Sequence, residues 1–542
     1  MAVFFLLLAF QPNRVVNGAG HGALNKHMAQ HVLLLPILLL LLYQLVLHVL
    51  LLPAKDLTLW SEVTLRWLLL MGVWYYALLL TTDGSSVKNR IKVSLIASSA
   101  LVGVLAIGQY LGLLEFLFPV FEGYDQEVYS VFGNQDLLGG YMALGLVLLL
   151  EKVFQSHRST NRSNKFMILL VLSLILWALV LSHSRSAWLA ASIGIVWCVF
   201  QEREQLTERS LGKWAAGASL LAALILVYHI ASIYSRIWST FSAGDIGGRL
   251  RLWFWEGAMR MIADHPFFGV GLGNFGYWSP RYLADALHDS WFPVVHHHNN
   301  IHTLHAHSDL LEFIAENGIV GLAILVWFIY LLHRRRLLYK PVTIAFFAFA
   351  LINPVLRSAP HVLFLFLYWA ATDTPSDTAH VVYTAKLPDK FRLYSKYTGA
   401  LIALLLLIAH GVVVLVPSYL LAQAEDTHLV WKAFPEADQP YRQELAIQAY
   451  DSATHWPVVP AQTYENFGIL QLELGNYNQA RALFETAAQR LDTGGLYWHL
   501  GQTAQLLGNL EEARAYYDQC LYRWPGFEPA ITARQAIFPS TE

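Results

Sequence analysis

The sequence predicts an all-α polytopic membrane protein with a C-terminal α-solenoid domain, and two observations carry this prediction. Of the 542 residues, 56% are hydrophobic and only 14% are charged, a composition that soluble domains rarely have. After residue 421 the long apolar runs stop, charged residues become more frequent, and a self-similar helical unit follows. Units of this kind stack as helix pairs. We therefore divide the chain into a membrane domain, residues 1–421, and a repeat domain, residues 422–542.

Eleven apolar runs in the membrane domain approach the ~20 residues that a helix needs to cross a bilayer. They lie at residues 31–52, 60–81, 91–118, 137–154, 166–182, 187–200, 214–233, 317–332, 341–355, 360–371 and 398–421. A further run, residues 1–10, is too short to span and has no basic segment before it, so it is neither a good signal peptide nor a complete helix. We expect about 11–12 transmembrane helices.

The loops between these runs differ sharply in Lys and Arg content. Loops on one side hold 20 of the 36 basic residues, whereas the short loops on the other side hold three, Lys55, Arg185 and Arg357. Loops rich in basic residues stay in the cytoplasm by the positive-inside rule. We therefore expect the polar loop 234–316 and the repeat domain to lie outside the cytoplasm.

Loop 234–316 contains arginines that could bind phosphate groups. Arg249 and Arg251 open an amphipathic stretch rich in Trp and Met, a pattern typical of a helix that lies along the membrane interface and meets lipid phosphates. The same arginines could instead bind a substrate diphosphate through bidentate hydrogen bonds. The glycines of GVGLGNF (269–275) resemble a phosphate-binding loop, but no strand precedes them, so this signal is weak.

The same loop crowds six histidines into residues 296–307. A metal site is one interpretation, but no paired carboxylate or HExxH spacing completes it, and we predict none. For residues 296–298 an unstructured surface tract is the preferred interpretation. His305 and His307 differ, because they directly precede a helix that Ser308 can cap. A neutral imidazole held there can accept the proton of an attacking hydroxyl, which is the role we predict for His307.

Two candidates come from other loops. Arg185 stands in a very short connection, where an arginine either reaches into the lipid headgroups or points into an internal cavity. Asn134 belongs to an acidic loop, residues 121–136, in which helix capping is the simpler explanation of Asn134 and Asp136. The functional hypothesis joins Arg185, Arg249 and His307 as catalytic residues. It assigns substrate binding to Arg251, His305 and Asn134.

The repeat domain contains two similar units offset by 33 residues, so that Tyr464 and Gly468 correspond to Tyr497 and Gly501. These units, about 461–493 and 494–527, resemble tetratricopeptide repeats. Helical segments around 439–452 could supply a third pair, since two repeats alone bury little core. Such arrays usually bind proteins or peptides, and the alternative is a solubilising cap on the membrane domain.

Four segments, in this order, resemble the recurring motifs of the bacterial O-antigen ligase, O-antigen polymerase and pilin-type O-oligosaccharyltransferase superfamily. They are GNQDLLGGYMALGL (133–146), SHSRSAWLAA (182–191), GGRLRLWFWEGAMRMIADHPFFGVGLGNF (247–275) and HAHSDLLEFIAENGIVGL (305–322). The resemblance covers about residues 90–370. It implies a glycosyltransferase C-type fold in the bacterial inner (cytoplasmic) membrane, and an inverting, metal-independent transfer of glycan from undecaprenyl diphosphate on the outer face, without a cofactor.

Carried over residue by residue, the resemblance places the essential histidine of the superfamily on His307 and its arginines on Arg185 and Arg249. Two departures from its pattern stand out. The superfamily usually has Asn-Pro-Asn where this chain has Asn134-Gln135-Asp136, and often His-Asn where it has His307-Ser308. The first departure puts a substrate role of Asp136 in doubt, and the second affects how the imidazole is oriented.

The acceptor decides between three related activities. A ligase uses a sugar of the lipid A core, a polymerase another lipid-linked glycan, and an oligosaccharyltransferase a protein Ser or Thr. Predicted partners are therefore the lipid-linked donor, one of these acceptors, membrane lipid and a protein ligand of the repeats, with no nucleic acid. The alternative class is a non-enzymatic transporter or scaffold for lipid-linked glycans. A transporter would more often show inverted repeats and broken midplane helices, and neither is evident in the sequence.

Overall fold

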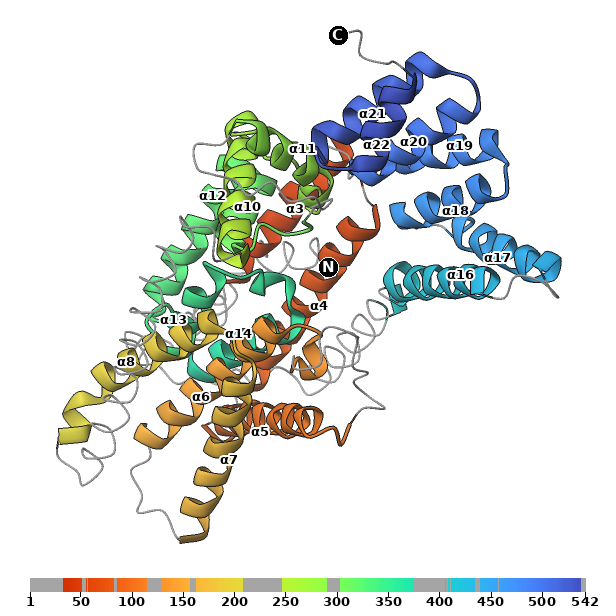
Figure 1. Ribbon diagram of the computed structural model, residues 1–542. Coiled ribbons are helices and arrows are strands. Elements are labelled where there is room, and N and C mark those ends of the chain that lie inside the picture. Colours follow the sequence, from red (N-terminus) through yellow and green to blue (C-terminus); the bar gives the residue numbers. More distant parts are fainter. Residues whose placement is uncertain are drawn as a thin grey trace.

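The computed structural model describes residues 33–50, 55, 57–81, 85–114, 128–155, 162–207, 246–289, 303–373, 405, 408–409, 411–433, 439–456 and 458–537. Every regular element in these residues is a helix, which confirms the predicted all-α class (Figure 1). The membrane domain contains α3 (Leu34–Leu50), α4 (Leu57–Thr81), α5 (Ser85–Tyr110), η1 (Ser130–Phe132), α6 (Gln135–Gln155), α7 (Arg162–Leu181), α8 (Arg185–Thr207), α10 (Ile246–Asp264), α11 (Phe275–His288), α12 (Asp309–Arg334), α13 (Pro341–Ala350), η2 (Val355–Arg357) and α14 (Ala359–Thr372). Further along the chain are η3 (Gly411–Leu415), α16 (Val416–Ala433), α17 (Gln439–Thr454), α18 (Ala461–Glu473), α19 (Tyr477–Ala488), α20 (Gly494–Leu506), α21 (Leu510–Arg523) and α22 (Glu528–Ile537).

Three of these helices, α5, α6 and α12, are long and apolar enough to cross a membrane, judged by length and composition. Four shorter apolar helices accompany them, namely α3, the Lys165–Leu181 part of α7, α13 and α14. The predicted span at 214–233 and the run 1–10 fall outside the described residues, as do residues 398–404, 406–407 and 410 of the predicted span 398–421. The count of eleven spans therefore stays a prediction.

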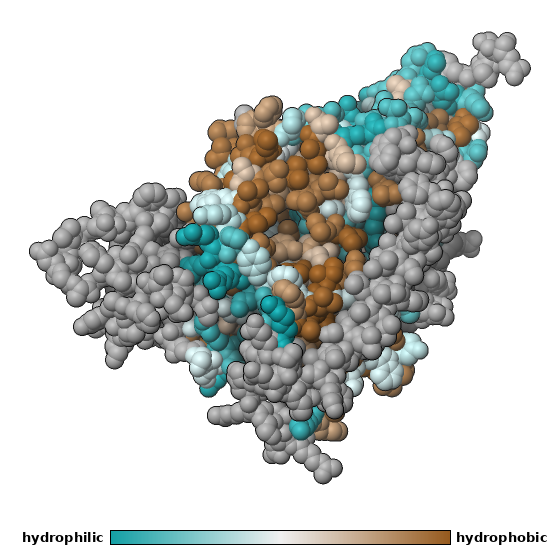
Figure 2. Space-filling model, turned by 90° about the vertical axis from the view of Figure 1, so that its left-hand side faces the viewer, coloured by the Kyte–Doolittle hydropathy of each residue, from teal (hydrophilic) through white to brown (hydrophobic). Residues whose placement is uncertain are grey.

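Helix α6 lies at the centre of the membrane domain, in contact with α5, α7, α8 and α13. The close approach depends on glycine, because Gly139 and Gly140 leave room that a side chain would fill. A Cβ atom at Gly139 would lie 2.9 Å from Cβ of Ala187, and one at Gly140 would lie 2.1 Å from the ring of Phe349. Figure 2 shows a broad hydrophobic patch on one face of the molecule, with hydrophilic side chains above and below it. An apolar face of this extent fits contact with lipid.

Helix α12 is interrupted at Gly318, whose φ of 59° and ψ of −162° are accessible essentially only to glycine. The segment after this break matches the predicted apolar run 317–332. The loop 269–273 fills the break, because the amides of Val270 and Gly271 donate to the carbonyls of Ala315 and Glu316 at 2.9 and 3.0 Å. The likeness of this loop to a phosphate-binding loop is therefore wrong, since the amides of residues 269–273 are bound within the protein, to α12, to Gln44 of α3 and to the His265 carbonyl.

The repeat domain is built from antiparallel helix pairs, α16 with α17, α18 with α19 and α20 with α21, followed by α22. The glycines at the crossing points permit close approach, because a Cβ atom at Gly468 would lie 2.6 Å from the Phe484 ring and one at Gly501 would lie 2.5 Å from the Tyr517 ring. Helix α17 supplies the expected third pair together with α16. The predicted domain boundary at residue 421 falls inside α16.

The last helix pair touches the membrane domain through α11 (Figure 1). The ring of Tyr522 on α21 stacks on His288 of α11 with centroids 4.6 Å apart. The hydroxyl of Tyr522 donates to Asp285 of the same helix. The repeats are thus attached to the segment that follows α10, which carries the candidate arginines.

Candidate functional site

The structure brings together residues from four segments that are distant in sequence. The Arg251 guanidinium, in the second turn of α10, lies 3.2 Å from the Asp136 carboxylate in the first turn of α6. The other oxygen of Asp136 accepts a hydrogen bond of 2.5 Å from the Ser184 hydroxyl, directly before α8. The fourth segment is the turn before α12, which carries His305 and His307.

His307 has a left-handed backbone with φ of +52°, a conformation that is uncommon outside glycine. Its half-buried imidazole stacks on the Phe254 ring of α10, with centroids 5.5 Å apart and planes 20° apart. Burial lowers the pKa of His307, and the positive charges of Arg251 and His305 lower it further. Asp136 and Glu312 act in the opposite direction without reversing the shift. The imidazole is therefore neutral at neutral pH, which is the form that accepts a proton.

His305 is held by a buried carboxylate. Its Nδ1 lies 3.1 Å from Oε1 of Glu312, whose side chain is 3% exposed. The same carboxylate receives the Nε–H of Arg357 from η2 at 2.9 Å. Arg357 also binds Glu316 at 2.7 Å, so that one guanidinium joins two acids a helical turn apart on α12.

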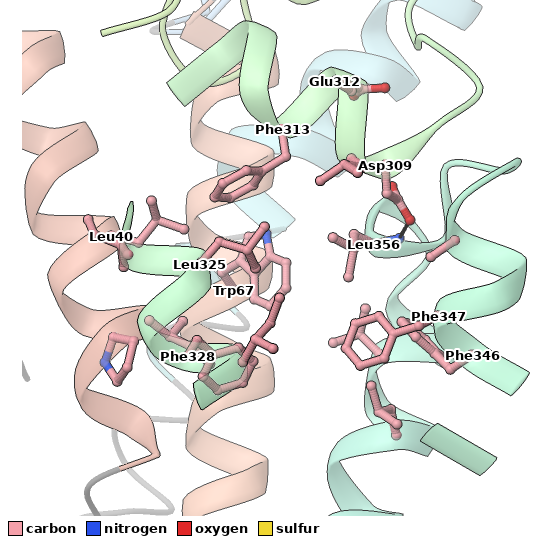
Figure 3. A pocket seen from close by; sticks show the side chains of 18 of the residues that line it. Leu40, Trp67, Asp309, Glu312, Phe313, Leu325, Phe328, Phe346, Phe347 and Leu356 are labelled. Carbon is pink, nitrogen blue, oxygen red and sulfur yellow. Dashed lines mark hydrogen bonds between the residues drawn. The ribbon is translucent and has the colours of Figure 1, made fainter. Parts of the chain in front are cut away.

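A cavity of about 720 Å³ lies between α3, α4, α12, α13 and α14. Its walls are aromatic and aliphatic, formed among others by Leu40, Trp67, Phe313, Leu325, Phe328 and Phe347 (Figure 3). Glu312 and Arg357 also contribute to the lining, and Figure 3 places Glu312 toward one end of the group of apolar side chains. The volume is within the ~300–1,000 Å³ of ordinary ligand sites. Glu312 of α12 therefore lies between the two features, because it lines the cavity and also contacts His305 in the histidine turn.

The other predicted site residues lie around this centre. Arg185 is exposed at the first residue of α8 and directly follows Ser184, the partner of Asp136. Arg249 is half-buried on α10, two residues before Arg251. Asn134 is exposed, and its side-chain oxygen accepts the amide of Leu137 at 3.1 Å, which agrees with the capping interpretation. Its predicted role in substrate binding remains untested.

The amphipathic face of α10 does not simply rest on lipid. Trp253 and Met261 are buried against protein, and Trp253 donates to the Leu283 carbonyl of α11 at 2.9 Å. This part of α10 packs on protein, whereas Met259 is 45% exposed, and the interpretation of α10 as an interfacial helix stays a prediction. The histidines at 296–298 and 302, also in loop 234–316, lie outside the described residues.

The sequence patterns predict no functional role for Glu312 or Arg357, and the departure at Asn134-Gln135-Asp136 puts a role of Asp136 in doubt. A signal existed for Glu312 and Glu316, because two acids at the start of an otherwise apolar span are costly unless paired and often mark a functional site. No local pattern identifies Arg357 as their partner, since it is 45 residues from Glu312 in the chain. The cavity had no signal either, because five separate helices form it.

A helical membrane domain with an arginine and histidine centre beside an apolar cavity is suited to substrates that are part lipid and part polar. Residues 169–326 match the family model described as O-antigen ligase, and residues 495–525 match a tetratricopeptide repeat. These matches confirm the resemblance seen in the motifs. The chain is thus similar to the O-antigen ligase family over residues 169–326 and carries a tetratricopeptide repeat near its C-terminus, and the likeness to the ligase family supports glycan transfer as an activity. No curated protein matches the chain.

Proposed function

We propose that this protein transfers a glycan from undecaprenyl diphosphate to an acceptor hydroxyl on the outer face of the bacterial inner membrane. The observation that carries the proposal is that one side chain, Glu312, belongs to the wall of the apolar cavity and also contacts the histidine turn. A donor with a long prenyl chain and a charged head needs such a pair of neighbouring environments.

In the proposed reaction the prenyl chain occupies the cavity and the diphosphate lies near the arginines of α10 and α8. The acceptor oxygen attacks the anomeric carbon on the face opposite the diphosphate, and the bond from that carbon to the diphosphate oxygen breaks. The hydroxyl proton passes to the neutral imidazole of His307. Undecaprenyl diphosphate leaves with the bonding electrons, and the anomeric configuration is inverted.

Arg249, Arg251 and Arg185 are proposed to stabilise the charge that develops on the leaving diphosphate. A guanidinium suits this role because it offers planar, paired donors and remains protonated. Asp136 is proposed to orient Arg251, since the two side chains form an ion pair 3.2 Å long. Because the arginines supply the positive charge, we propose that the transfer needs no metal ion.

The repeat domain bears on the choice of acceptor. Helix α21 contacts α11 through Tyr522, and α11 packs on α10, the helix that carries Arg249 and Arg251. A protein bound by the repeats would therefore be held near the proposed site. This supports a protein acceptor or a protein partner, while a lipid A core sugar and a second lipid-linked glycan remain the other acceptors compatible with the chemistry.

The test is His307→Ala in the full chain, with membrane insertion checked. We expect transfer to fall by about 10²-fold or more, because a general base contributes ~10²–10⁴-fold, and the lipid-linked glycan should accumulate. His333→Ala is the control, because His333 is exposed at the far end of α12 and contacts Tyr339. If His307→Ala attaches glycan like the wild type, His307 is not the base and the proposed catalytic assignment fails.

A further inference from the structure

We propose that Glu312 is a positioning residue that fixes the His305–His307 turn for proton transfer, with Arg357 holding its carboxylate in place. The inference rests on the proposed function and adds to it two residues that neither the motifs nor the family match assigns. Neither residue needs to touch the substrate for this role. Both act through the geometry of the turn.

Both oxygens of Glu312 are directed to the turn. Oε2 accepts the backbone amide of Ala306 at 3.0 Å, and Oε1 lies 3.1 Å from Nδ1 of His305. Ala306 is fully buried and directly precedes His307. The carboxylate therefore fixes the backbone on one side of His307 and the orientation of the neighbouring imidazole.

Arg357 fixes Glu312 in turn. Its guanidinium reaches Oε1 of Glu312 with two nitrogens, at 2.9 and 2.8 Å, and binds Glu316 at 2.7 Å. Burial alone lowers the pKa of Arg357, but the two acids raise it more, so its pKa lies above the usual value and the charge is permanent. A buried ion pair such as Arg357 and Glu312 is tolerated only when hydrogen bonds and opposite charges satisfy both groups.

The 3₁₀ turn that carries Arg357 is itself attached to the start of α12. Asp309 accepts the backbone amides of Val355 and Leu356 at 2.8 and 2.9 Å, and Figure 3 shows Asp309 directed at Leu356. Arg66 of α4 donates to the Arg357 carbonyl. The position of Arg357 is thus set by α4 and α12 together, which makes it a rigid support for Glu312.

His307 needs this support because of its backbone. A histidine at φ of +52° holds a sparsely populated conformation, which persists only where the surroundings determine it. Phe254 contacts one face of the imidazole, and the Glu312 bond to Ala306 fixes the preceding peptide. The charged and titratable groups that act on His307 are Arg251, His305, Asp136 and Glu312.

Glu312→Gln tests the proposal, with Glu316→Gln as the matched control. A glutamine offers one acceptor oxygen where Arg357, His305 and Ala306 all need one, so the turn loses at least one bond. Both variants remove one carboxylate from Arg357, but Glu316 accepts the Gly273 amide at 2.9 Å, on the side of the glycine loop rather than the histidine turn. Both are assayed as full-length protein in detergent, with the lipid extract of a strain lacking this gene as donor and acceptor.

We expect Glu312→Gln to lower kcat about tenfold or more, a part of the ~10²–10⁴-fold that a placed general base contributes, with KM for the donor little changed. The acid limb of the kcat/KM profile should move to lower pH, because the lost negative charge had raised the pKa of His307. Glu316→Gln should leave that limb in place. A purely structural role for Glu312 would reduce the amount of active protein without moving the limb.

An unchanged kcat and an unmoved acid limb in Glu312→Gln would overturn the proposal. If that variant fails to insert, Arg357→Lys serves instead, because lysine keeps the charge but cannot bind Glu312 and Glu316 with a planar fork. It should lower kcat with little change in KM, and wild-type kcat would contradict the role of Arg357. Failure of this inference is distinct from failure of the proposed function, since His307→Ala would then still be inactive.

Discussion

Replacing Gly318 with alanine should destabilise the membrane domain severely. The φ of 59° and ψ of −162° are strained for any residue with a side chain, which costs about 1–3 kcal/mol. The new Cβ would lie 2.4 Å from the Phe267 carbonyl oxygen and 2.7 Å from the Gly269 nitrogen, both backbone atoms. Relief requires the loop to move, which breaks the bonds from Ile319 to the Pro266 carbonyl and from Val320 to that of Phe267, each worth about 0.5–1.5 kcal/mol net.

The expected destabilisation is about 2–6 kcal/mol in all. The assay is size-exclusion chromatography of detergent-purified protein after heating. The quantity compared is the midpoint temperature at which the monodisperse peak is lost. Gly133→Ala is the control, because Gly133 has φ of +63° in the same domain but a Cβ atom added there would meet nothing within 4 Å, so only the strain of about 1–2 kcal/mol applies. Equal midpoints for the two variants would refute the argument that the loop 266–269 is clamped against the break in α12.

Two further predictions test the site and the attachment of the repeats. Arg251→Gln should move the acid limb of kcat/KM to higher pH, opposite in sign to Glu312→Gln, because Arg251 lowers the pKa of His307; a limb that stays in place would mean that Arg251 does not act on His307. Tyr522→Phe keeps the ring that stacks on His288 but loses the bond to Asp285. Hydrogen exchange in α11 should then rise about 2–13-fold, from a loss of about 0.5–1.5 kcal/mol. Tyr419→Phe is the control, because Tyr419 is exposed on α16, and equal exchange in the two variants would contradict a stable contact.

Much of the fold was predictable because it depends on patterns within single segments. Apolar length marks α5, α6 and α12, and the spacing of glycine and aromatic residues marks the helix pairs of the repeats. The sequence also indicates where α12 is interrupted, since the predicted apolar run begins at residue 317, next to Gly318. The polar residues before it form the first part of α12, because their side chains are paired with Arg357 and with the histidine turn.

The candidate site was predictable only in part. His305 and His307 stand out locally, because they precede a helix and are close in sequence. Arg357 does not, because its role follows from the packing of η2 on the start of α12, which no single segment encodes. The amides of loop 269–273 illustrate the same limit. Their glycine pattern suggests phosphate, but the acceptor that each amide meets depends on α12 and on Gln44 of α3, which accepts the Leu272 amide at 3.1 Å.

The break in α12 connects the lipid and polar parts of the proposed reaction. Before the break, α12 presents Glu312 to the histidine turn and Glu316 to the glycine loop. Both parts of the helix line the cavity, with Phe313 before the break and Leu325 and Phe328 after it. A continuous α12 could not use the carbonyls of Ala315 and Glu316 for the loop while keeping its own hydrogen-bond pattern. One helix thus supports both the cavity proposed for the prenyl chain and the proposed base, so a change at Gly318 should reduce donor binding and proton transfer together. Glu312→Gln keeps the size of a side chain in the cavity wall, so it should act mainly on proton transfer.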